Sequence, residues 1–329
     1  MPVSKVFVFI AILIFTGYSL AQTSPTPTPN AQEIYQRQQE ERLQQQQAEQ
    51  QRRQTLERFR TLQEASETKY RGRPVPRAVV ANIDELYRGP SQKELGRLKP
   101  FDEDLKQYAA FLRPRNTGIV RLVQDAGCGD TTKVLSASGP CVEYSMPGHG
   151  SSFSFREASY RLDRLADVRF TGESLILTGV MQNGILTGLG NIALEGVTNE
   201  TKGMEYLVNF KPATDLAEAV KIGKKLAAGS EQGGYLYASE LRVVEGMTYA
   251  IRSVAYRGNL FRAINGYVYD ELKFDTRSDI LAAFRVIRKH SDGSVTIIWK
   301  VLSEKESPKL KSGKNEPARP DPSKFGAGD

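Results

Sequence analysis

The sequence is poor in the residues that most often carry out chemistry, since its 329 residues include two cysteines, two histidines and one tryptophan. Histidine is the side chain whose ordinary pKa lies closest to neutral pH, so its scarcity limits the acid–base mechanisms that are available. The spacings of common zinc motifs, such as paired Cys-x-x-Cys, are also missing. We therefore expect neither a metal nor a cofactor.

Long apolar runs are missing as well, except at the start of the chain. Val6–Phe15 is an uninterrupted apolar run that follows Lys5, and Ser19–Ala21 offers small residues for cleavage. The run is shorter than the ~20 residues that span a bilayer. We interpret residues 1–21 as a cleaved export signal, with an uncleaved anchor as the alternative. The mature protein is then expected to be secreted or periplasmic, as part of the cell envelope, with no stable membrane span.

The charged residues are dispersed along the chain. The formal net charge is +7, from 45 basic and 38 acidic residues. No stretch concentrates the basic residues enough to indicate a nucleic-acid site, so we expect no nucleic-acid partner. The excess of positive charge favours anionic partners such as envelope lipid or glycan.

The N-terminal part of the expected mature chain differs in composition from the middle. Residues 22–30 alternate proline with hydroxyl residues, which is typical of an extended tether. Residues 31–71 are rich in Gln, Glu and Arg and predict a long polar helix. Its apolar residues do not keep a sustained heptad, so a solvated single helix is one interpretation and a coiled coil for self-association is the other. The short apolar stripe on which the second depends is Leu56, Phe59 and Leu62.

Two further segments flank the main β-rich region. Residues 72–116 predict a connector of short helices, one of which begins with the capping-box spacing of Ser91 and Glu94. Residues 303–329 are rich in charge and proline and poor in apolar residues. Such a composition cannot offset the entropy of ordering, so this segment is predicted to be a disordered tail.

Residues 117–302 change to the patterns of β-strands, bounded by Gly, Asp or Ser. Asn183–Gly184 predicts a two-residue hairpin turn, and one helix is predicted over Thr214–Ala228, with Gly229 placed to end it. The expected fold class is α+β, a mainly antiparallel sheet domain, either a sandwich or a half-barrel, with one crossing helix. The predicted strands include Gly118–Gln124, Ser152–Leu162, Val168–Thr171, Leu175–Met181, Ile192–Val197, Tyr206–Phe210, Tyr235–Val244 and Thr248–Arg257.

The clearest local pattern lies at residues 283–302, where two β-branched and aromatic runs flank Asp292–Gly293. That pair supplies the positive φ angles of a two-residue turn. With Ser291 opposite Ser294, strand alternation gives one face to the core and the other to solvent. The predicted core face carries Phe284, Val286, Val295, Ile297, Trp299 and Val301, and the predicted solvent face carries Arg285, Lys289, Thr296 and Lys300.

The two cysteines, Cys128 and Cys141, are predicted to form a disulfide bond, because an even pair flanking a loop in an exported chain most simply makes one. Closing a loop of this size stabilises a fold by ~3 kcal/mol in the chain-entropy model. A metal site is the alternative. Its ligands would come from Asp125, Cys128, Asp130, Cys141, Glu143 and His149.

His149 stands in a glycine-rich stretch followed by serines, which suggests a hydrolase that uses His149 with Ser151 or Ser152. The context differs from a nucleophile elbow, because this stretch leads into a strand and not from a strand into a helix. A glycine-rich turn with an exposed imidazole explains the pattern more simply. We therefore assign no catalytic residue and keep these as the hydrolase candidates.

Tyr267 and Tyr269 are the candidates for a binding surface. Strand alternation places both on one face, beside Gly266 and Asp270. A packed sheet face is the alternative interpretation of the same alternation.

These patterns favour an exported, non-enzymatic binding module of the cell envelope or the extracellular space, for a lipophilic or anionic ligand. A sheet curved around an apolar cavity would make it a lipid carrier, and a closed sandwich would make it an adhesion or assembly module. A secreted hydrolase that uses His149 is the competing hypothesis. A structural protein that self-associates through its N-terminal helix is the third.

Overall fold

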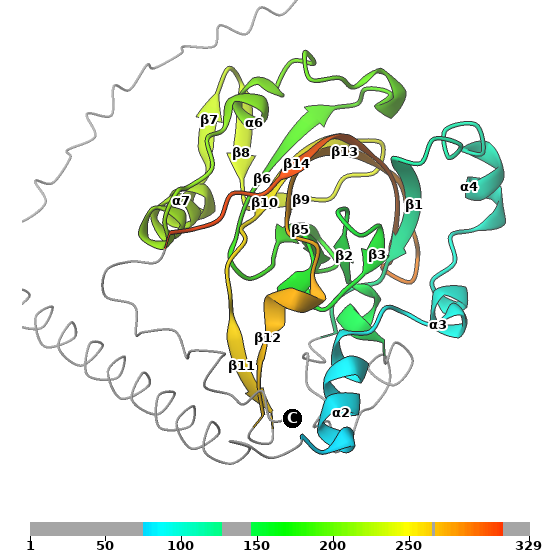
Figure 1. Ribbon diagram of the computed structural model, residues 1–329. Helices are drawn as coiled ribbons and strands as arrows, with labels where there is room; N and C mark the ends of the chain where they lie inside the picture. Colours follow the sequence, from blue (N-terminus) through cyan, green and yellow to red (C-terminus); the bar gives the residue numbers. More distant parts are fainter. Residues whose placement is uncertain (1–74, 127–145, 265–266, 312–329) are drawn as a thin grey trace, which may run out of the picture. The chain divides into compact units, whose positions relative to one another are not determined.

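The computed structural model describes residues 75–126, 146–264 and 267–311. In these ranges the chain forms mainly antiparallel sheets with few helices, as expected for a β-rich α+β domain (Figure 1). The expected export signal, tether, long polar helix and most of the expected tail lie outside the described residues. No helix in the described ranges is long and apolar enough to cross a lipid bilayer.

The largest sheet has seven strands in the order β1, β14, β13, β10, β6, β8 and β7 (Figure 1). All of its pairings are antiparallel. In chain order these strands are β1 (Thr117–Leu122), β6 (Gln182–Gly190), β7 (Ser230–Gln232), β8 (Tyr235–Ala238), β10 (Thr248–Ala255), β13 (Ser278–Lys289) and β14 (Val295–Glu306).

A smaller sheet of five strands and a two-stranded ribbon complete the β-structure. The smaller sheet contains β2 (Ser152–Ser154), β3 (Ser159–Tyr160), β4 (Val168–Phe170), β5 (Ser174–Leu177) and β9 (Glu240–Arg242), and the ribbon contains β11 (Phe261–Ile264) and β12 (Tyr267–Asp270). The helices are α2 (Arg77–Tyr87), α3 (Gln92–Arg97), α4 (Asp102–Gln107), α6 (Glu205–Asn209) and α7 (Leu216–Ala228), with 3₁₀ turns η1 (Pro147–Gly150), η2 (Asp163–Leu165), η3 (Leu194–Gly196) and η4 (Glu271–Phe274).

The main core lies between the two larger sheets and is rich in aromatic side chains. Phe284 of β13 is fully buried there. Its ring stacks on Tyr249 of β10 and on Phe155 just after β2, at centroid distances of 5.2 and 5.7 Å. The first of these contacts lies within the large sheet, whereas the contact with Phe155 joins the large sheet to the segment just after β2 and helps to hold the two sheets face to face.

The opposite face of the seven-stranded sheet is also covered. Ile185, Ala283 and Ile298 are buried on this face, against side chains from η3, α6 and α7. Thr296 is fully buried as well. The prediction that this face of the β13–β14 hairpin meets solvent is therefore wrong for its middle, because helical segments elsewhere in the chain pack over it. The predicted core face is confirmed, since Phe284, Val286, Val295, Ile297 and Trp299 are buried between the sheets and Val301 packs against them.

The turn of this hairpin differs from the two-residue prediction. The N–H of His290 donates to the carbonyl of Ser294, which leaves a three-residue loop whose last member, Gly293, has φ +81°. A positive φ at the last position of a three-residue loop is a common hairpin solution. The register then shifts by one between Val286 and Arg288, so the predicted core face is kept.

Asn183–Gly184 does not form a turn. Both residues lie inside β6, and the chain turns earlier, between Leu177 and Gln182. β5 and β6 belong to different sheets, so the intervening residues cross between layers and do not close a hairpin. Two predicted strands are also wrong: Ile192–Val197 contains the 3₁₀ turn η3, and Tyr206–Phe210 contains most of α6.

The helix predicted over Thr214–Ala228 is confirmed as α7. The Asp215 side chain accepts a hydrogen bond from the N–H of Glu218 and caps its start, and Gly229, with φ +76°, ends it. Its inner side carries Ala219 and Leu226, which are buried. At the far end of the domain, β14 continues to Glu306 and Leu310 is buried, so order extends past the expected start of the tail.

The predicted capping box at the start of α3 is confirmed and carries an added ion pair. Arg88 donates to both carboxylate oxygens of Glu94, at 2.7 Å each. Arg88 and the Ser91 groups together lower the pKa of Glu94 to about 2. This contact fixes the connection between α2 and α3.

The Glu94 carboxyl predicts a specific loss of stability in acid. The pKa of the Glu94 carboxyl is lower in the folded state than in the unfolded state. Its contribution to the free energy of unfolding is therefore fully present above the ordinary pKa of 4.5 and is lost as the pH falls through 2. The pair is partly exposed, so we expect a contribution of about 1 kcal/mol. Glu94→Gln should flatten the dependence of the unfolding free energy on pH between these values, measured by urea denaturation. Glu103→Gln, at an exposed position on α4, is the matched control, and equal slopes for the two variants would contradict the assignment.

Candidate functional site

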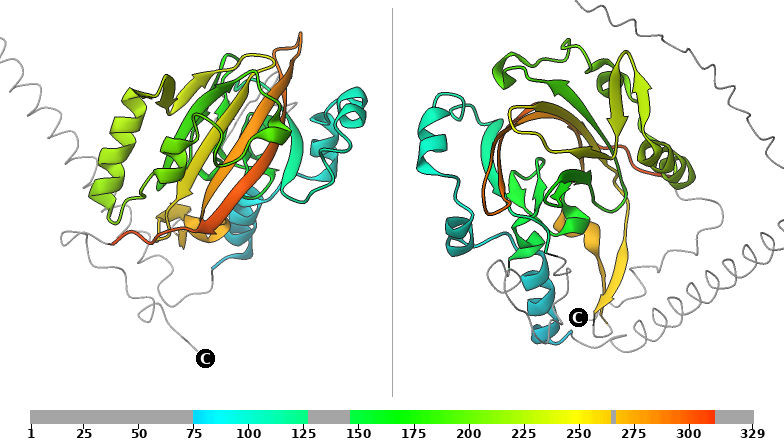
Figure 2. Two further views of the ribbon diagram at one scale, coloured as in Figure 1. Left: turned by 90° about the horizontal axis from the view of Figure 1, so that it is seen from above. Right: turned by 180° about the vertical axis from the view of Figure 1, so that it is seen from behind.

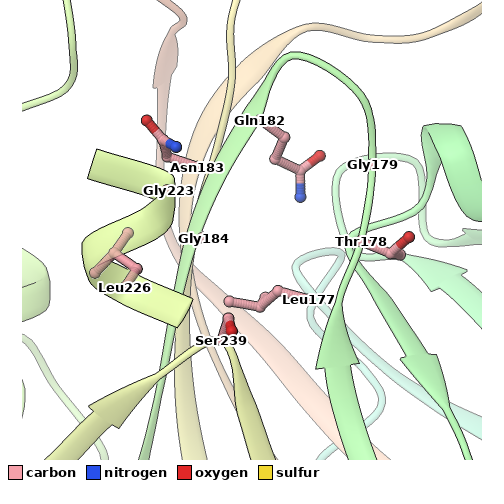
Figure 3. A pocket seen from close by; sticks show the side chains of 9 residues that line it. All are labelled: Leu177, Thr178, Gly179, Gln182, Asn183, Gly184, Gly223, Leu226 and Ser239. Atoms are coloured by element: carbon pink, nitrogen blue, oxygen red, sulfur yellow. The ribbon is translucent and has the colours of Figure 1, made fainter. Parts of the chain in front are cut away.

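A cavity of about 130 Å³ lies where the two larger sheets separate, between β5, β6 and α7 (Figure 3). None of its lining side chains is ionisable. The cavity is partly open to solvent. Its lining residues are Leu177, Thr178, Gly179, Gln182, Asn183, Gly184, Gly223, Leu226 and Ser239.

Two crossings of the chain between the sheets create this cavity. The first runs from β5 to β6 through Thr178–Met181, and the second runs from β8 to β9 through Ser239. The N–H of Leu177 donates to the carbonyl of Ser239 at 2.8 Å and ties the two crossings together. Gly179, with φ +98°, allows the sharp change of direction in the first.

The second crossing leaves part of β6 without a neighbouring strand. The ladder between β6 and β8 covers only Leu186–Thr187 opposite Tyr237–Ala238. Beyond Ala238 the chain leaves for the smaller sheet. Among the strands in the described ranges, none pairs with Gln182–Ile185 on the edge that faces away from β10.

The direction of the backbone groups on this edge follows from the pairing of β6 with β10. Tyr256 donates its N–H to the carbonyl of Met181 at 2.9 Å, and the same register places Gly184 opposite Ser253. In an antiparallel ladder, successive residues alternate between pairs that exchange hydrogen bonds and pairs whose N–H and C=O point the other way. Gly184 is three residues from Met181. Its N–H and C=O therefore point away from β10, toward the cavity.

Side chains and glycines shape the space beside this edge. A Cβ atom at Gly184 would lie 2.8 Å from the Leu177 side chain, and one at Gly223 would lie 3.3 Å from the amide of Asn183. Both glycines therefore let a neighbouring element approach β6 closely. Leu177 and Leu226 provide apolar walls on the two sides of the strand (Figure 3).

Asn183 is buried and fixes α7 to β6. Its Nδ2 donates to the carbonyl of Ala219 at 3.0 Å, and its Oδ1 accepts from the Tyr256 hydroxyl at 2.8 Å. The Tyr256 hydroxyl in turn accepts from the N–H of Ala213 at 2.8 Å. Burial raises the pKa of Tyr256 to about 12, so the hydroxyl stays protonated and keeps donating at neutral pH. The α7 wall of the cavity is thus held in place by polar contacts as well as by Leu226.

The carboxamide of Gln182 points into the cavity (Figure 3) and makes only long hydrogen bonds in the described ranges. Its Oε1 lies 3.5 Å from Arg156 Nη2, and its Nε2 lies 3.5 Å from Asp167 Oδ1. Contacts of this length are weak. A ligand in the cavity could therefore gain a hydrogen bond from this amide at little cost.

Behind Gln182 lies a buried cluster of two acids and two arginines. Arg156 donates from Nε to Asp167 at 2.9 Å and from Nη1 to Asp275 at 2.9 Å, and Arg277 donates to Asp275 at 2.6 Å. The side chains of Arg156, Asp167 and Asp275 have no exposed surface. Burial raises the pKa of Asp275, and the guanidiniums of Arg156 and Arg277 act in the opposite direction. Removing one partner from such a cluster would leave an uncompensated buried charge.

Asp167 is the centre of this cluster. One of its oxygens accepts from the N–H of Phe155 at 2.7 Å and the Ser154 hydroxyl at 3.1 Å, and the other accepts from the Ser253 hydroxyl at 2.5 Å. Ser253 belongs to β10 of the large sheet, while Ser154 belongs to β2 of the smaller one. Asp167 therefore joins the two sheets next to the place where they separate.

The residues proposed from sequence for hydrolysis lie elsewhere, around η1. Ser151 and Ser152 are buried, and the Ser151 hydroxyl donates to the carbonyl of Gly148 at 3.0 Å. His149 has φ +48°, in the left-handed region that few residues other than glycine adopt. The hydroxyl of Ser151 is thus bonded within its own turn, and its carbonyl accepts from the N–H of Phe170 on β4 at 2.9 Å.

The other proposed residues also lie away from the cavity. Tyr269 is buried beneath α2, where its hydroxyl lies 3.0 Å from that of Tyr87, and Tyr267 stacks on it at 6.4 Å. Cys128 and Cys141 lie outside the described residues, so the disulfide stays a prediction. In the described ranges, no group of three or more His, Cys, Asp or Glu side chains could hold a metal ion.

Sequence reasoning missed the cavity and the charge cluster. The glycines at 179, 184 and 223 are visible in the sequence, but only the fold shows that they meet around one opening. No protein-family model, no curated protein and no solved structure matches the chain. The function is therefore inferred from the geometry of this site.

Proposed function

We propose that the protein is a non-enzymatic binding module that accepts an extended peptide segment at the free edge of β6. The observation that carries the proposal is the N–H and C=O of Gly184, which face a cavity and have no strand partner in the described ranges. A main-chain donor and acceptor of this kind are the recognition groups of strand addition. A residue of an added strand would accept from the Gly184 N–H and donate to its C=O.

The lining of the cavity defines the side chain that would enter it. Its volume of about 130 Å³ is close to the ~150 Å³ of cavities that hold a benzene ring. Leu177 and Leu226 favour an apolar group of this size, such as valine or leucine, and the absence of ionisable lining groups disfavours a charged one. The volume is smaller than the ~300 Å³ at which ligand pockets usually begin, which supports a single side chain over an acyl chain.

The same lining supports a binding role over an enzymatic one. General acid–base catalysis needs a titratable group within reach of the reacting atoms. Gln182 and Ser239 can orient a ligand through hydrogen bonds, whereas the Asn183 amide and the Thr178 hydroxyl are engaged within the fold. The nearby charges are paired in the cluster around Asp167. The expected export signal supports a place for the module in the cell envelope or outside the cell.

Defined peptides test this function. The probes are Ac-Ser-Thr-Val-Thr-Ser-NH₂, its analogue with aspartate in place of valine, and an analogue in which an ester replaces the amide N–H of the central residue. The valine peptide should bind at least about 10-fold more tightly than the aspartate peptide, because the cavity offers no cation. The ester should bind about 5-fold to 10-fold more weakly, because it lacks one main-chain donor. Affinities are measured by titration calorimetry or by NMR shifts.

Two variants on α7 give a matched control. Gly223→Leu places a side chain at the cavity, whereas Ala227→Leu adds the same side chain at an exposed position one turn later. Gly223→Leu should weaken binding of the valine peptide at least about 10-fold and Ala227→Leu less than about 2-fold. The melting temperature of each variant is measured alongside, because a Cβ atom at Gly223 already meets the amide of Asn183 at 3.3 Å. Equal affinity for all three peptides would contradict the proposal, and this comparison does not depend on how either variant folds.

A further inference from the structure

The outer side of α7 exposes large apolar side chains that no described element covers. Leu216 and Val220, four residues apart, are 41 % and 51 % exposed. Leu236 of β8 is 45 % exposed and lies near the end of the helix, where a Cβ atom at Gly229 would meet it at 3.6 Å. Figure 1 places α7 beside β7 and β8, at the opposite end of the large sheet from β1 and α4. A single exposed leucine needs no explanation, but exposed apolar side chains on successive turns of one helix, with another near its end, indicate a contact.

Positive charge borders this apolar row. A helix advances 100° per residue, so Lys224 follows Val220 on the same side and Lys221 lies further round on the exposed surface. Both lysines are exposed. Ala217, Ala227 and Ala228 lie on the same side of the helix and are exposed as well. This sector of the helix contains no acidic residue.

The acidic residues at the start of α7 accept hydrogen bonds from backbone N–H groups there. Asp215 accepts from the N–H of Glu218 at 2.8 Å, and Glu218 accepts from the N–H of Thr214 at 2.8 Å. By helical spacing, Glu218 points away from Leu216, Val220 and Lys224, and lies next to Lys221, three residues later. The outer surface of α7 is therefore apolar along one line and basic beside it.

The helix is fixed in this orientation by its buried side. That side carries Ala219 and Leu226, which are buried, and Asn183 of β6 donates to the carbonyl of Ala219. In Figure 2, α7 runs along the outside of the large sheet with its outer side turned away from the strands. The domain thus presents the row Leu216, Val220 and Lys224 as a rigid, outward surface.

We infer that this surface docks the domain onto an anionic lipid bilayer. A helix with a narrow apolar row and lysines beside it lies in the plane of the interface, with the apolar side chains among the acyl chains and the ammonium groups at the headgroups. Each lysine near an anionic surface contributes about 1 kcal/mol. Charge complementarity selects a membrane over a neutral partner. The inference concerns the outer side of α7 and does not depend on peptide binding at Gly184.

Sedimentation of the full-length protein with extruded vesicles tests the inference. The vesicles contain phosphatidylcholine alone, or phosphatidylcholine with 30 mol % phosphatidylglycerol as an order-of-magnitude model of an anionic membrane. Binding should require phosphatidylglycerol and weaken in high salt. The double variant Lys221→Gln/Lys224→Gln should lower the partition coefficient about 30-fold, which corresponds to the loss of two lysine contacts.

The matched control is Lys93→Gln/Lys106→Gln, which makes the same change of charge at exposed positions on α3 and α4. It should lower partitioning less than about 3-fold, as expected for a general effect of net charge. Val220→Ser should weaken binding even in low salt, because it removes an inserted apolar group. The inference would be overturned if the two lysine pairs gave equal losses of binding, or if neutral vesicles bound as well as anionic ones. It would also be overturned if the protein formed a dimer in solution that Val220→Ser dissociates.

Discussion

Asp167→Asn should lower the free energy of unfolding by about 3 to 5 kcal/mol, the usual loss when one partner of a buried ion pair is removed. The substitution keeps the size of the side chain but removes its charge, so Arg156 loses a fully buried partner. The new amide group would also face donors that the carboxylate now accepts from, including the N–H of Phe155 and the hydroxyl of Ser253. Because whole domains are stable by only ~5 to 15 kcal/mol, the effect should be evident in urea denaturation at neutral pH.

Glu304→Gln is the control for this variant. Glu304 is exposed on β14, so the same chemical change there should alter the unfolding free energy by less than about 0.5 kcal/mol. A loss below about 1 kcal/mol for Asp167→Asn would show that the cluster does not hold the sheets together. If the free energy of unfolding falls while its slope against urea concentration is unchanged, the folded and unfolded states keep their compactness.

Phe284→Ala should cost about 3 to 5 kcal/mol, because it removes a fully buried ring and leaves a cavity between the two sheets. The rings of Phe155 and Tyr249 both stack on Phe284, but Tyr249 is fixed on β10 and Phe155 lies just after β2 of the smaller sheet, so they cannot both close the gap. Phe261→Ala, at a ring that is 40 % exposed on β11, is the matched control and should cost less than about 1 kcal/mol. Equal losses, measured by urea denaturation, would contradict the assignment of Phe284 to the main core.

The elements that could be predicted from sequence are those whose signals are local. α7 has a capping acid, helical spacing and a terminal glycine within a single stretch, and the structure places it within two residues of the prediction. The core face of the β13–β14 hairpin was also predictable, since alternation alone fixes which side chains share a face. Its other face was not, because the segments that cover it come from η3, α6 and α7.

Asn183–Gly184 shows how a strong local signal can fail. The pair suits a type I′ turn, but that turn requires both flanking strands to belong to one sheet. Here the strand before it, β5, pairs with β4 and β9, and β6 pairs with β10. At this position glycine serves close packing against Leu177 and not a turn.

The candidate site could not be predicted for the same physical reason. The cavity depends on where two segments cross between sheets, and a crossing has no signature in composition or period. The scarce residues that suggested chemistry, His149 among them, lie in a different part of the fold. The sheet edge at Gly184 involves backbone groups that every residue carries, so it becomes visible only when the neighbouring strand is seen to leave.

Hydrogen exchange at the Gly184 amide tests the proposed function most directly. In the free protein this N–H should exchange faster than that of Ile185, which by the same alternation points toward β10. Saturation with the valine peptide should slow exchange at Gly184 at least about 10-fold and leave Ile185 unchanged, measured residue by residue by NMR. Exchange at Gly184 that is equally fast with and without the saturating peptide would contradict strand addition at this edge.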